Sequence, residues 1–210
     1  MVGTFISFDG GPGSGKGTMI KKTFEYIFDK SKKYDNILIT DQPTNGPFGI
    51  KVRELIKKQK GSHDLAHEIF QAFVNDREWH IEHTIKPALE NNFVVLADRY
   101  KYSGAAYQAA QGISLDEVLS VERKFLAPDL AIILDVEPNE ALRRISSAED
   151  KDKRKITDNF RQLEFVSNLQ KYFLKMPSFF PNENIHLINA NTQIPSVFEQ
   201  IKSLLEEVLI

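Results

Sequence analysis

The glycine-rich stretch at residues 10–18 constrains the fold of this chain more than any other segment. It follows a short apolar run at residues 4–8 and leads into residues 19–28, whose apolar side chains recur at helical spacing. This order predicts a strand, a loop and a helix. Glycines in the loop allow positive φ angles and bring backbone N–H groups close to anionic oxygens, while the following helix directs its positive end at them. The stretch therefore predicts a phosphate-binding loop.

Lys16 is placed to reach the β- and γ-phosphates of a nucleotide, and a nearby hydroxyl can bind Mg²⁺. In the usual G-x-x-x-x-G-K-[ST] pattern the hydroxyl directly follows the lysine, whereas here Gly17 stands there and Thr18 comes next. We therefore expect Thr18 to lie on the metal side. The alternative is a glycine-rich turn with a surface lysine. The nucleotide-binding residues predicted in this loop are Gly11, Gly13, Ser14, Gly15, Lys16, Gly17 and Thr18.

The composition limits the classes of protein that the chain can belong to. Its 210 residues suit one domain, with at most a mobile flap. With 27 basic and 29 acidic residues the net charge is −2, which does not favour binding to nucleic acid or to a membrane surface. The absence of cysteine excludes disulfides and thiol catalysis. Without a secretion signal or an apolar run long enough to span a membrane, we expect a cytoplasmic protein.

Further apolar runs predict a buried second strand at residues 36–40 and more strands at residues 93–97, 130–134 and 185–189. The intervening segments predict helices at residues 49–59, 64–90, 103–111, 115–126, 138–146, 158–176 and 195–209, and Pro87 is expected to kink or shorten the second of these. Alternating strands and helices indicate an α/β fold with a parallel sheet covered by helices on both faces. Ligands of such sheets bind beyond the carboxyl ends of the strands. The glycine loop, the loop at Asp41 and the pair Asp98-Arg99 should therefore converge.

Two pairs of residues suggest nucleotide chemistry. Asp98 at a strand end suits a role on Mg²⁺, and Arg99 can hold a phosphate through two hydrogen bonds, although the two could also form a simple salt bridge. Phe73 and Arg77 lie one helical turn apart and could form a nucleobase pocket, or equally be a core aromatic and a surface arginine.

The charged run at residues 149–155 is either a solvated loop or a lid that closes over phosphates.

Several motifs resemble those of the thymidylate kinase family of nucleoside monophosphate kinases, across nearly the whole chain. Residues 98–108 resemble its D-R-Y-x-x-S-x-x-A-Y-Q block, residues 73–77 its F-x-x-x-R helix, and residues 49–55 its G-x-x-I-R-E-L segment. Residues 128–130 are similar to its P-D-L entry to a strand, and residues 163–165 fall where it has the helix after the lid.

The resemblance implies phosphorylation of dTMP to dTDP by ATP with Mg²⁺, usually by a homodimer. It also implies a three-layer P-loop kinase fold, with a five-stranded parallel sheet in a single domain over residues 1–210 and a short lid at about residues 147–158. By position, Phe73 would stack on thymine and Arg77 would bond its carbonyl, while Arg53 and Arg99 would hold the acceptor phosphate. The other residues that it implies are Pro43, Ser103 and Gln108 lining the substrate site, Tyr107 crowding the 2′ position, Arg144 near the adenine, and Lys16, Asp98 and Arg99 in catalysis, with Thr18 and Asp98 on the metal.

The chain departs from the family pattern in three places. Pro12 stands where the family commonly has an acidic residue, residues 41–43 read D-Q-P in place of R-E-P, and residues 158–160 read D-N-F where the family has an arginine. These departures leave two alternatives open. One is a kinase for another deoxynucleoside monophosphate or a deoxynucleoside, and the other is a non-catalytic nucleotide-binding protein.

Overall fold

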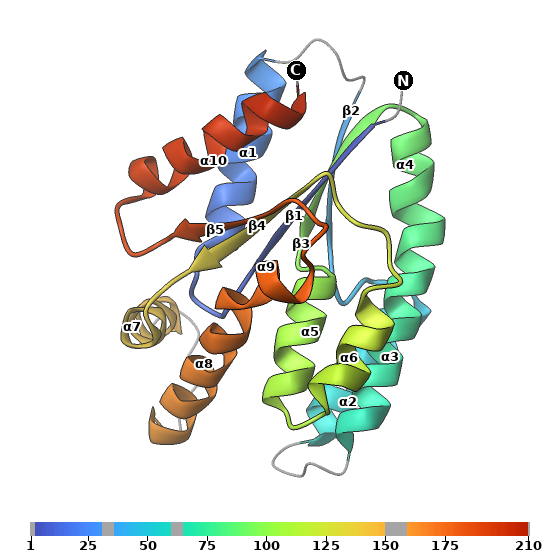
Figure 1. The fold of residues 1–210 in the computed structure, drawn as a ribbon, viewed down its shortest axis with the longest axis vertical. Helices are drawn as coiled ribbons and strands as arrows, with labels where there is room; N and C mark the ends of the chain where they lie inside the picture. Colours follow the sequence, from blue (N-terminus) through green and yellow to red (C-terminus); the bar gives the residue numbers. More distant parts are fainter. Residues whose placement is uncertain (1–2, 31–35, 60–64, 150–158, 210) are drawn as a thin grey trace.

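A five-stranded parallel sheet forms the centre of the protein in a computed structural model that describes residues 3–30, 36–59, 65–149 and 159–209 (Figure 1). The strand order is β2-β3-β1-β4-β5, and every neighbouring pair is parallel. The strands are β1 (Thr4–Gly10), β2 (Asn36–Asp41), β3 (Phe93–Asp98), β4 (Leu130–Asp135) and β5 (Ile185–Asn189). This confirms the expected five-stranded parallel sheet.

Helices cover both faces of the sheet. The helices are α1 (Lys16–Lys30), α2 (Pro47–Gln59), α3 (Ala66–His80), η2 (Ile81–Ile85), α4 (Lys86–Glu90), α5 (Lys101–Ala110), α6 (Leu115–Glu122), α7 (Pro138–Glu149), α8 (Asn159–Leu174), α9 (Met176–Phe179) and α10 (Ile194–Leu209). Helices α1 and α10 pack on one face, and α4, α5 and α8 pack on the other (Figure 1). The expected three layers are therefore confirmed.

Successive side chains of the central strands point into opposite layers. Ile6 of β1 and Leu96 of β3 belong to the core under α1 and α10, while Phe5 and Val95 belong to the core under the long helix α3–η2–α4. Strand β2 is different, because it lies at an edge of the sheet and half of Ile39 is exposed (49%). The expectation of a buried second strand is wrong, since the strand order leaves β2 with only one neighbour.

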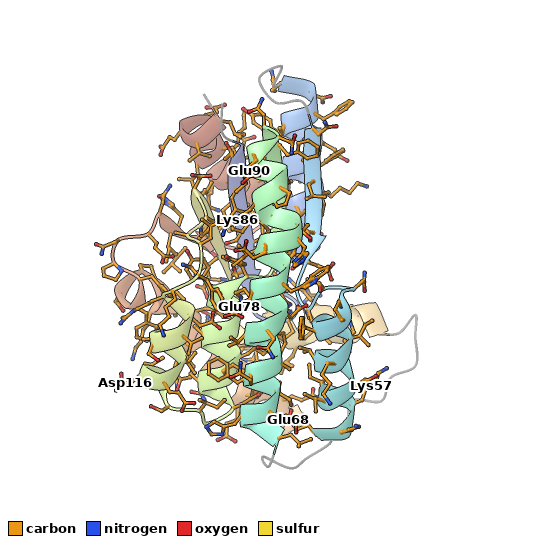
Figure 2. All side chains as sticks on the ribbon, turned by 90° about the vertical axis from the view of Figure 1, so that its right-hand side faces the viewer. Lys57, Glu68, Glu78, Lys86, Glu90 and Asp116 are labelled. Atoms are coloured by element: carbon orange, nitrogen blue, oxygen red, sulfur yellow. The ribbon has the colours of Figure 1, made fainter. Side chains whose placement is uncertain are left out.

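Pro87 does not end its helix. Figure 2 shows α3, η2 and α4 as one continuous helix, with Glu68, Glu78, Lys86 and Glu90 spaced along it and α2 and α6 at its sides. A π-helical turn at Ile81–Ile85 ends two residues before Pro87, and its last bond joins the Lys86 N–H to the Ile81 carbonyl. Proline clashes with the carbonyl four residues earlier, and a wider turn can accommodate it. The helix therefore continues to Glu90, so Pro87 does not shorten it.

Other boundaries also differ from the sequence prediction: α2 begins two residues earlier than expected and α6 ends four residues earlier. Helix α5 begins at Lys101, two residues earlier than expected, and a short helix α9 follows α8. Of the lid predicted at about residues 147–158, the first three residues end α7 and the others lie outside the described residues. In the part of the chain that is described, no helix is long and apolar enough to cross a membrane.

The carboxyl ends of β2, β3 and β1 meet at one edge of the sheet. Asp41 of β2 and Phe8 of β1 both pair with Asp98 of β3 in the register. Strand β1 lies between β3 and β4, so the loop after β1 is at the point where the chain changes direction across the sheet. Ligands of open α/β sheets bind at such a point.

Candidate active site

The loop after β1 folds around the amino group of Lys16. The Lys16 Nζ donates to the carbonyl oxygens of Gly10 (3.1 Å) and Gly11 (3.0 Å) and to the Ser14 Oγ (3.4 Å). Burial, and secondarily the positive charge of Arg99, lower the pKa of Lys16 to about 8. The amino group is thus held inside the curve of the loop, as a phosphate-binding lysine requires.

The backbone of the loop also requires glycine. Gly13 has a φ of 73°, and a Cβ there would lie 2.5 Å from the carbonyl oxygen of Ala141 on α7. Any side chain would therefore push the loop away from α7. Gly10 and Gly15 also have positive φ angles, as the sequence predicts. Gly11, in contrast, is not one of the glycines that have a positive φ among the described residues.

Arg99 connects the end of β3 to this loop. Its φ of 71° is unusual for a residue with a side chain and turns the chain sharply from β3 into α5. The Arg99 N–H donates to the Phe8 carbonyl (2.9 Å), and its Nη1 reaches the Gly10 carbonyl (3.5 Å). The guanidinium also lies over the Tyr107 ring, 5.1 Å from its centroid. Strand ends far apart in the sequence thus place Lys16 and Arg99 at one carbonyl.

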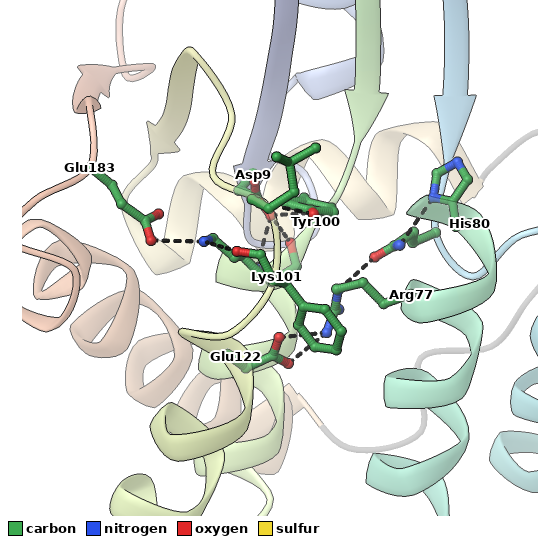
Figure 3. Close-up of polar contacts among 11 residues, drawn as sticks. Asp9, Arg77, His80, Tyr100, Lys101, Glu122 and Glu183 are labelled. Atoms are coloured by element: carbon green, nitrogen blue, oxygen red, sulfur yellow. Dashed lines mark hydrogen bonds and ion pairs between the residues drawn. The ribbon is translucent and has the colours of Figure 1, made fainter. Parts of the chain in front are cut away.

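Asp9, the penultimate residue of β1, stabilises the start of α5 (Figure 3). Its buried Oδ1 accepts hydrogen bonds from the N–H groups of Tyr100 (2.9 Å) and Ser103 (2.9 Å) and from the Ser103 hydroxyl (2.6 Å). A carboxylate that accepts from the first N–H groups of a helix satisfies donors that lack partners within the helix. The hydroxyl of Ser103, predicted to line the substrate site, is therefore engaged with Asp9.

Two carboxylate oxygens near Lys16 are suited to a cation. Asp98 Oδ1 and Asp9 Oδ2 are buried and have no hydrogen-bond partner. Burial raises the pKa of Asp98, although Lys16 and Arg99 oppose the shift. The described residues contain no group of three or more side chains arranged to hold a metal ion. The two unpartnered oxygens suit Mg²⁺, which is usually bound by one or two carboxylates together with water and substrate phosphates.

A cavity of about 200 Å³ opens beside Arg99, and most of the predicted substrate residues line it. It lies between the loop after β2 and helices α3 and α5. The predicted residues that line it are Pro43, Phe73, Arg77, Arg99, Ser103, Tyr107 and Gln108. Gln42, Tyr100, Gly104 and Gln111 also line it, as do Ile56 and Ile69. The structure therefore brings together residues from four segments of the sequence, as the resemblance implies.

Arg77 is held in a chain of buried polar contacts (Figure 3). Its Nη1 contacts both carboxylate oxygens of Glu122 (2.7 and 2.6 Å), and its Nε donates to the Gln42 Oε1 (3.1 Å). Gln42 Nε2 lies 3.0 Å from His80 Nδ1, and His80 Nε2 lies 2.7 Å from the Thr40 hydroxyl. Arg77 is 1% exposed and Glu122 0%, so both charges are removed from solvent. Arg77 is therefore not the surface arginine that the sequence left as an alternative.

Arginine has donors only, and this fixes the direction of every bond in the chain. Gln42 must turn its oxygen to Arg77 and its NH₂ group to His80, so His80 Nδ1 accepts and His80 Nε2 carries the proton given to Thr40. Burial and the charge of Arg77 lower the pKa of His80 to about 4. Burial likewise raises the pKa of Glu122 to about 7, and the attraction of Arg77 opposes this shift.

Arg53 lies beside the cavity but is not among its described lining residues. Its guanidinium donates to the carbonyl oxygens of Pro43 and Thr44 and lies 3.9 Å from a carboxylate oxygen of Asp41. It therefore supports the loop after β2, and its contact with the acceptor phosphate stays a prediction.

Arg144 and Thr18 line a second hollow, of about 700 Å³, next to the glycine loop. The Arg144 Nη2 donates to the Ala190 carbonyl (2.8 Å), and its Nε pairs with Glu140 (2.7 Å). Ser14 and Gly15 face the same hollow. Gly17, in contrast, lines a separate hollow together with Asp98. The structure thus places Gly17, rather than Thr18, on the side of Asp98.

Comparison with known proteins decides the family. The family model described as thymidylate kinase matches residues 8–201. The chain belongs to the thymidylate kinase family. It is 34% identical to a probable thymidylate kinase of Thermococcus kodakarensis, with 98% of both chains covered, and 34% identical to a thymidylate kinase of Desulfotalea psychrophila, with 97% of this chain and 96% of the relative covered. A probable thymidylate kinase of Thermococcus gammatolerans is 32% identical over 100% of this chain and 99% of its own.

As a member of this family the chain is an enzyme, a nucleoside monophosphate kinase. Sequence reasoning missed three of its polar residues: Asp9, Glu122 and the neutral His80. A signal for Glu122 existed, because it follows Val118 by four residues and so lies on the buried face of α6. Asp9 offered none, since it directly precedes the glycine loop and reads as part of it.

Proposed function

We propose that the protein transfers the terminal phosphoryl group of ATP to dTMP, which gives ADP and dTDP. The observation that carries this proposal is the meeting of Lys16 and Arg99 at the Gly10 carbonyl. Ser14 and Gly15 of the glycine loop line the hollow that contains Arg144, and Arg99 lines the cavity that contains Phe73. A donor and an acceptor nucleotide can therefore meet there with their phosphates adjacent.

The donor side suits ATP. Lys16 and the N–H groups of the glycine loop would bind the terminal phosphates, and the positive end of α1 adds to the attraction. Arg144 would lie against the adenine, because it lines the hollow beyond the loop and is held in place by Glu140 and the Ala190 carbonyl. A guanidinium plane stacks well on an aromatic ring.

The acceptor side suits a thymine nucleotide. Phe73 offers a ring for stacking, and Arg77 offers donors to a base carbonyl. Gln108 and Gln111 line the same cavity, and each has a buried amide oxygen without a hydrogen-bond partner. Thymine presents carbonyl acceptors on either side of an N–H donor, so such an edge would satisfy both kinds of group. Tyr107, packed under Arg99, would crowd the 2′ position and favour deoxyribose.

The reaction needs no covalent intermediate with the protein. An acceptor phosphate oxygen attacks the γ-phosphorus of ATP, the bond to the β–γ bridging oxygen breaks, and ADP leaves. Arg99 would neutralise the acceptor phosphate, and Lys16 the charge that develops on the transferred group. Asp98, with Asp9 behind it, would hold Mg²⁺, which when bound neutralises phosphate charge and orients the oxygens of ATP.

Steady-state assays of ADP formation test the proposal. ATP would be supplied with dTMP, dUMP, dCMP, dAMP or thymidine in parallel, and dTMP should give the highest kcat/KM. Lys16→Ala and Arg99→Ala should each reduce kcat at least about a hundredfold while the fold is kept. Equal rates with all the monophosphates, or a preference for thymidine, would contradict the assignment.

Three finer points stay proposals. We propose a homodimer, as the resemblance implies, in the cytoplasm, as the sequence predicts, and the first turn of α2 offers the exposed apolar side chains Phe48 and Ile50 for a subunit contact. Light scattering should then give twice the mass of one chain, and a single-chain mass would refute the dimer. The single domain with a lid at about residues 147–158 also remains a prediction from the sequence.

A further inference from the structure

Arg77 lies at the base cavity as a fully buried charge, so something must hold it there. Its carboxylate partner, Glu122, is on α6 and is not among the described residues that line the cavity. Replacing a buried ion pair by apolar side chains is often neutral or stabilising, so stability alone does not explain why a carboxylate occupies the buried face of α6. Glu122 acts on the cavity only through Arg77.

The packing around the pair leaves little freedom. A Cβ at Gly104 would lie 2.3 Å from Glu122 Oε1 and 2.7 Å from Arg77 Nη2, so the absence of a side chain at position 104 makes room for the pair. The rings of Phe125 and Tyr100 lie 5.4 and 5.8 Å from the guanidinium carbon. Glu122 and Gln42 thus hold two of the guanidinium nitrogens, and the third, Nη2, faces Gly104 in the cavity wall.

We propose that Glu122 is a positioning residue for base selection: by fixing the Arg77 guanidinium, it makes the cavity select a base that offers a carbonyl over one that offers an amino group. This inference rests on the proposed function, because it concerns the acceptor nucleotide of that reaction. A guanidinium can only donate, so it pairs with a keto oxygen and repels an exocyclic NH₂ group. Without Glu122, Arg77 would turn to other acceptors, such as the unpaired oxygens of Gln108 and Gln111, and this selection would weaken.

The test compares Glu122→Gln with a variant that moves the carboxylate. In Gln42→Glu/Glu122→Gln the new carboxylate replaces the amide oxygen that is now 3.1 Å from Arg77 Nε, and His80 can accommodate it by exchanging its tautomer. Gln42→Glu alone is the matched control, and Glu122→Asp keeps the carboxylate if Glu122→Gln does not fold. For each protein, kcat and KM are measured with dTMP, dUMP and dCMP, and melting temperatures are recorded.

Glu122→Gln should raise KM for dTMP and dUMP about tenfold, leave KM for ATP unchanged, and reduce the preference for dTMP over dCMP about tenfold. The carboxylate swap and Glu122→Asp should each restore part of that preference. A lower melting temperature with an unchanged dTMP:dCMP preference would overturn the proposal and leave Glu122 with a purely structural role.

Binding measured by calorimetry without ATP separates this inference from the proposed function. If the unmodified enzyme does not phosphorylate dTMP, the proposed function fails, and the dTMP:dCMP affinity ratio of the same variants still decides the role of Glu122. If the unmodified enzyme phosphorylates dTMP and the ratio is the same in Glu122→Gln, only the inference fails.

Discussion

Lys16 and Arg99 donate to the same carbonyl oxygen, that of Gly10, at 3.1 and 3.5 Å. Two cations that share one acceptor repel each other, and this repulsion contributes to the lowered pKa of Lys16. Phosphate oxygens would give both cations the counter-charge that one carbonyl cannot provide. The free enzyme thus holds the pair in an arrangement that phosphate would stabilise.

The affinity for ATP should therefore fall at alkaline pH. Lys16 must be charged to attract phosphate, and its pKa of about 8 in the free enzyme means that it loses the proton well below the usual lysine pKa of 10.5. Between pH 8 and pH 9.5 we expect kcat/KM for ATP to drop about fifteenfold at saturating dTMP. Lys16→Arg keeps its charge throughout and should show a flat, lower profile. A flat profile for the unmodified enzyme up to pH 9.5 would refute the prediction.

Asp9 should prove important both for stability and for the pKa of Lys16. Asp9→Ala would leave two backbone N–H groups and the Ser103 hydroxyl without their acceptor in the core, which should lower the free energy of unfolding by about 2–4 kcal/mol. Asp9→Asn keeps an acceptor oxygen. The decrease in its free energy of unfolding, measured with urea, should therefore be clearly smaller than for Asp9→Ala.

Asp9→Asn also removes a negative charge that raises the pKa of Lys16. The alkaline drop in kcat/KM for ATP should consequently begin at a lower pH in this variant. Equal destabilisation by alanine and asparagine, together with an unmoved pH profile, would show that Asp9 only fills space.

The hydroxyl on the metal side can be located by substitution. Thr18 faces the hollow of Arg144, whereas Gly17 is exposed on the side of Asp98, where an added Cβ would meet no atom within 4 Å. Thr18→Val should thus weaken ATP binding by the same factor with Mg²⁺ and with EDTA. Gly17→Ser should fold normally and strengthen binding only when Mg²⁺ is present. If Thr18→Val weakens binding only with Mg²⁺, Thr18 itself is the metal hydroxyl, as the sequence predicts.

The parts of the site that depend on local sequence could be predicted. The phosphate loop requires glycine at Gly13, a lysine at the start of a helix and a preceding strand, and these are contiguous in the chain. The convergence of Arg99 with Lys16 followed from a general property of parallel sheets, namely that strand ends share an edge. Neither prediction needed the position of any side chain.

The buried polar chain could not be predicted in the same way. The neutral state of His80 depends on the orientation of Gln42, which depends on Arg77, which is fixed by Glu122 on α6. These residues come from three segments, and the direction of each hydrogen bond is set by the next residue in the series. The early start of α5 has a similar origin, because Asp9 of β1 provides its cap. Pairings between distant segments determine these features, and the spacing of residues along the chain does not encode them.

His80 should make the fold sensitive to acid. Its pKa is about 4 in the folded protein, against 6.5 for an ordinary histidine, as in the unfolded chain. Between these pH values the unfolded chain therefore binds a proton that the folded chain does not. Its stabilising contribution is complete above pH 6.5 and is lost as the pH falls toward 4, by up to about 3 kcal/mol. Chemical denaturation at steps from pH 7 to pH 4 should show this loss. In His80→Gln the free energy of unfolding should depend less steeply on pH. His67→Gln, on an exposed position, is the control and should leave the slope unchanged. An equal slope in His80→Gln and the unmodified protein would mean that other groups cause the acid sensitivity and that His80 takes up its proton without breaking the bond from Gln42.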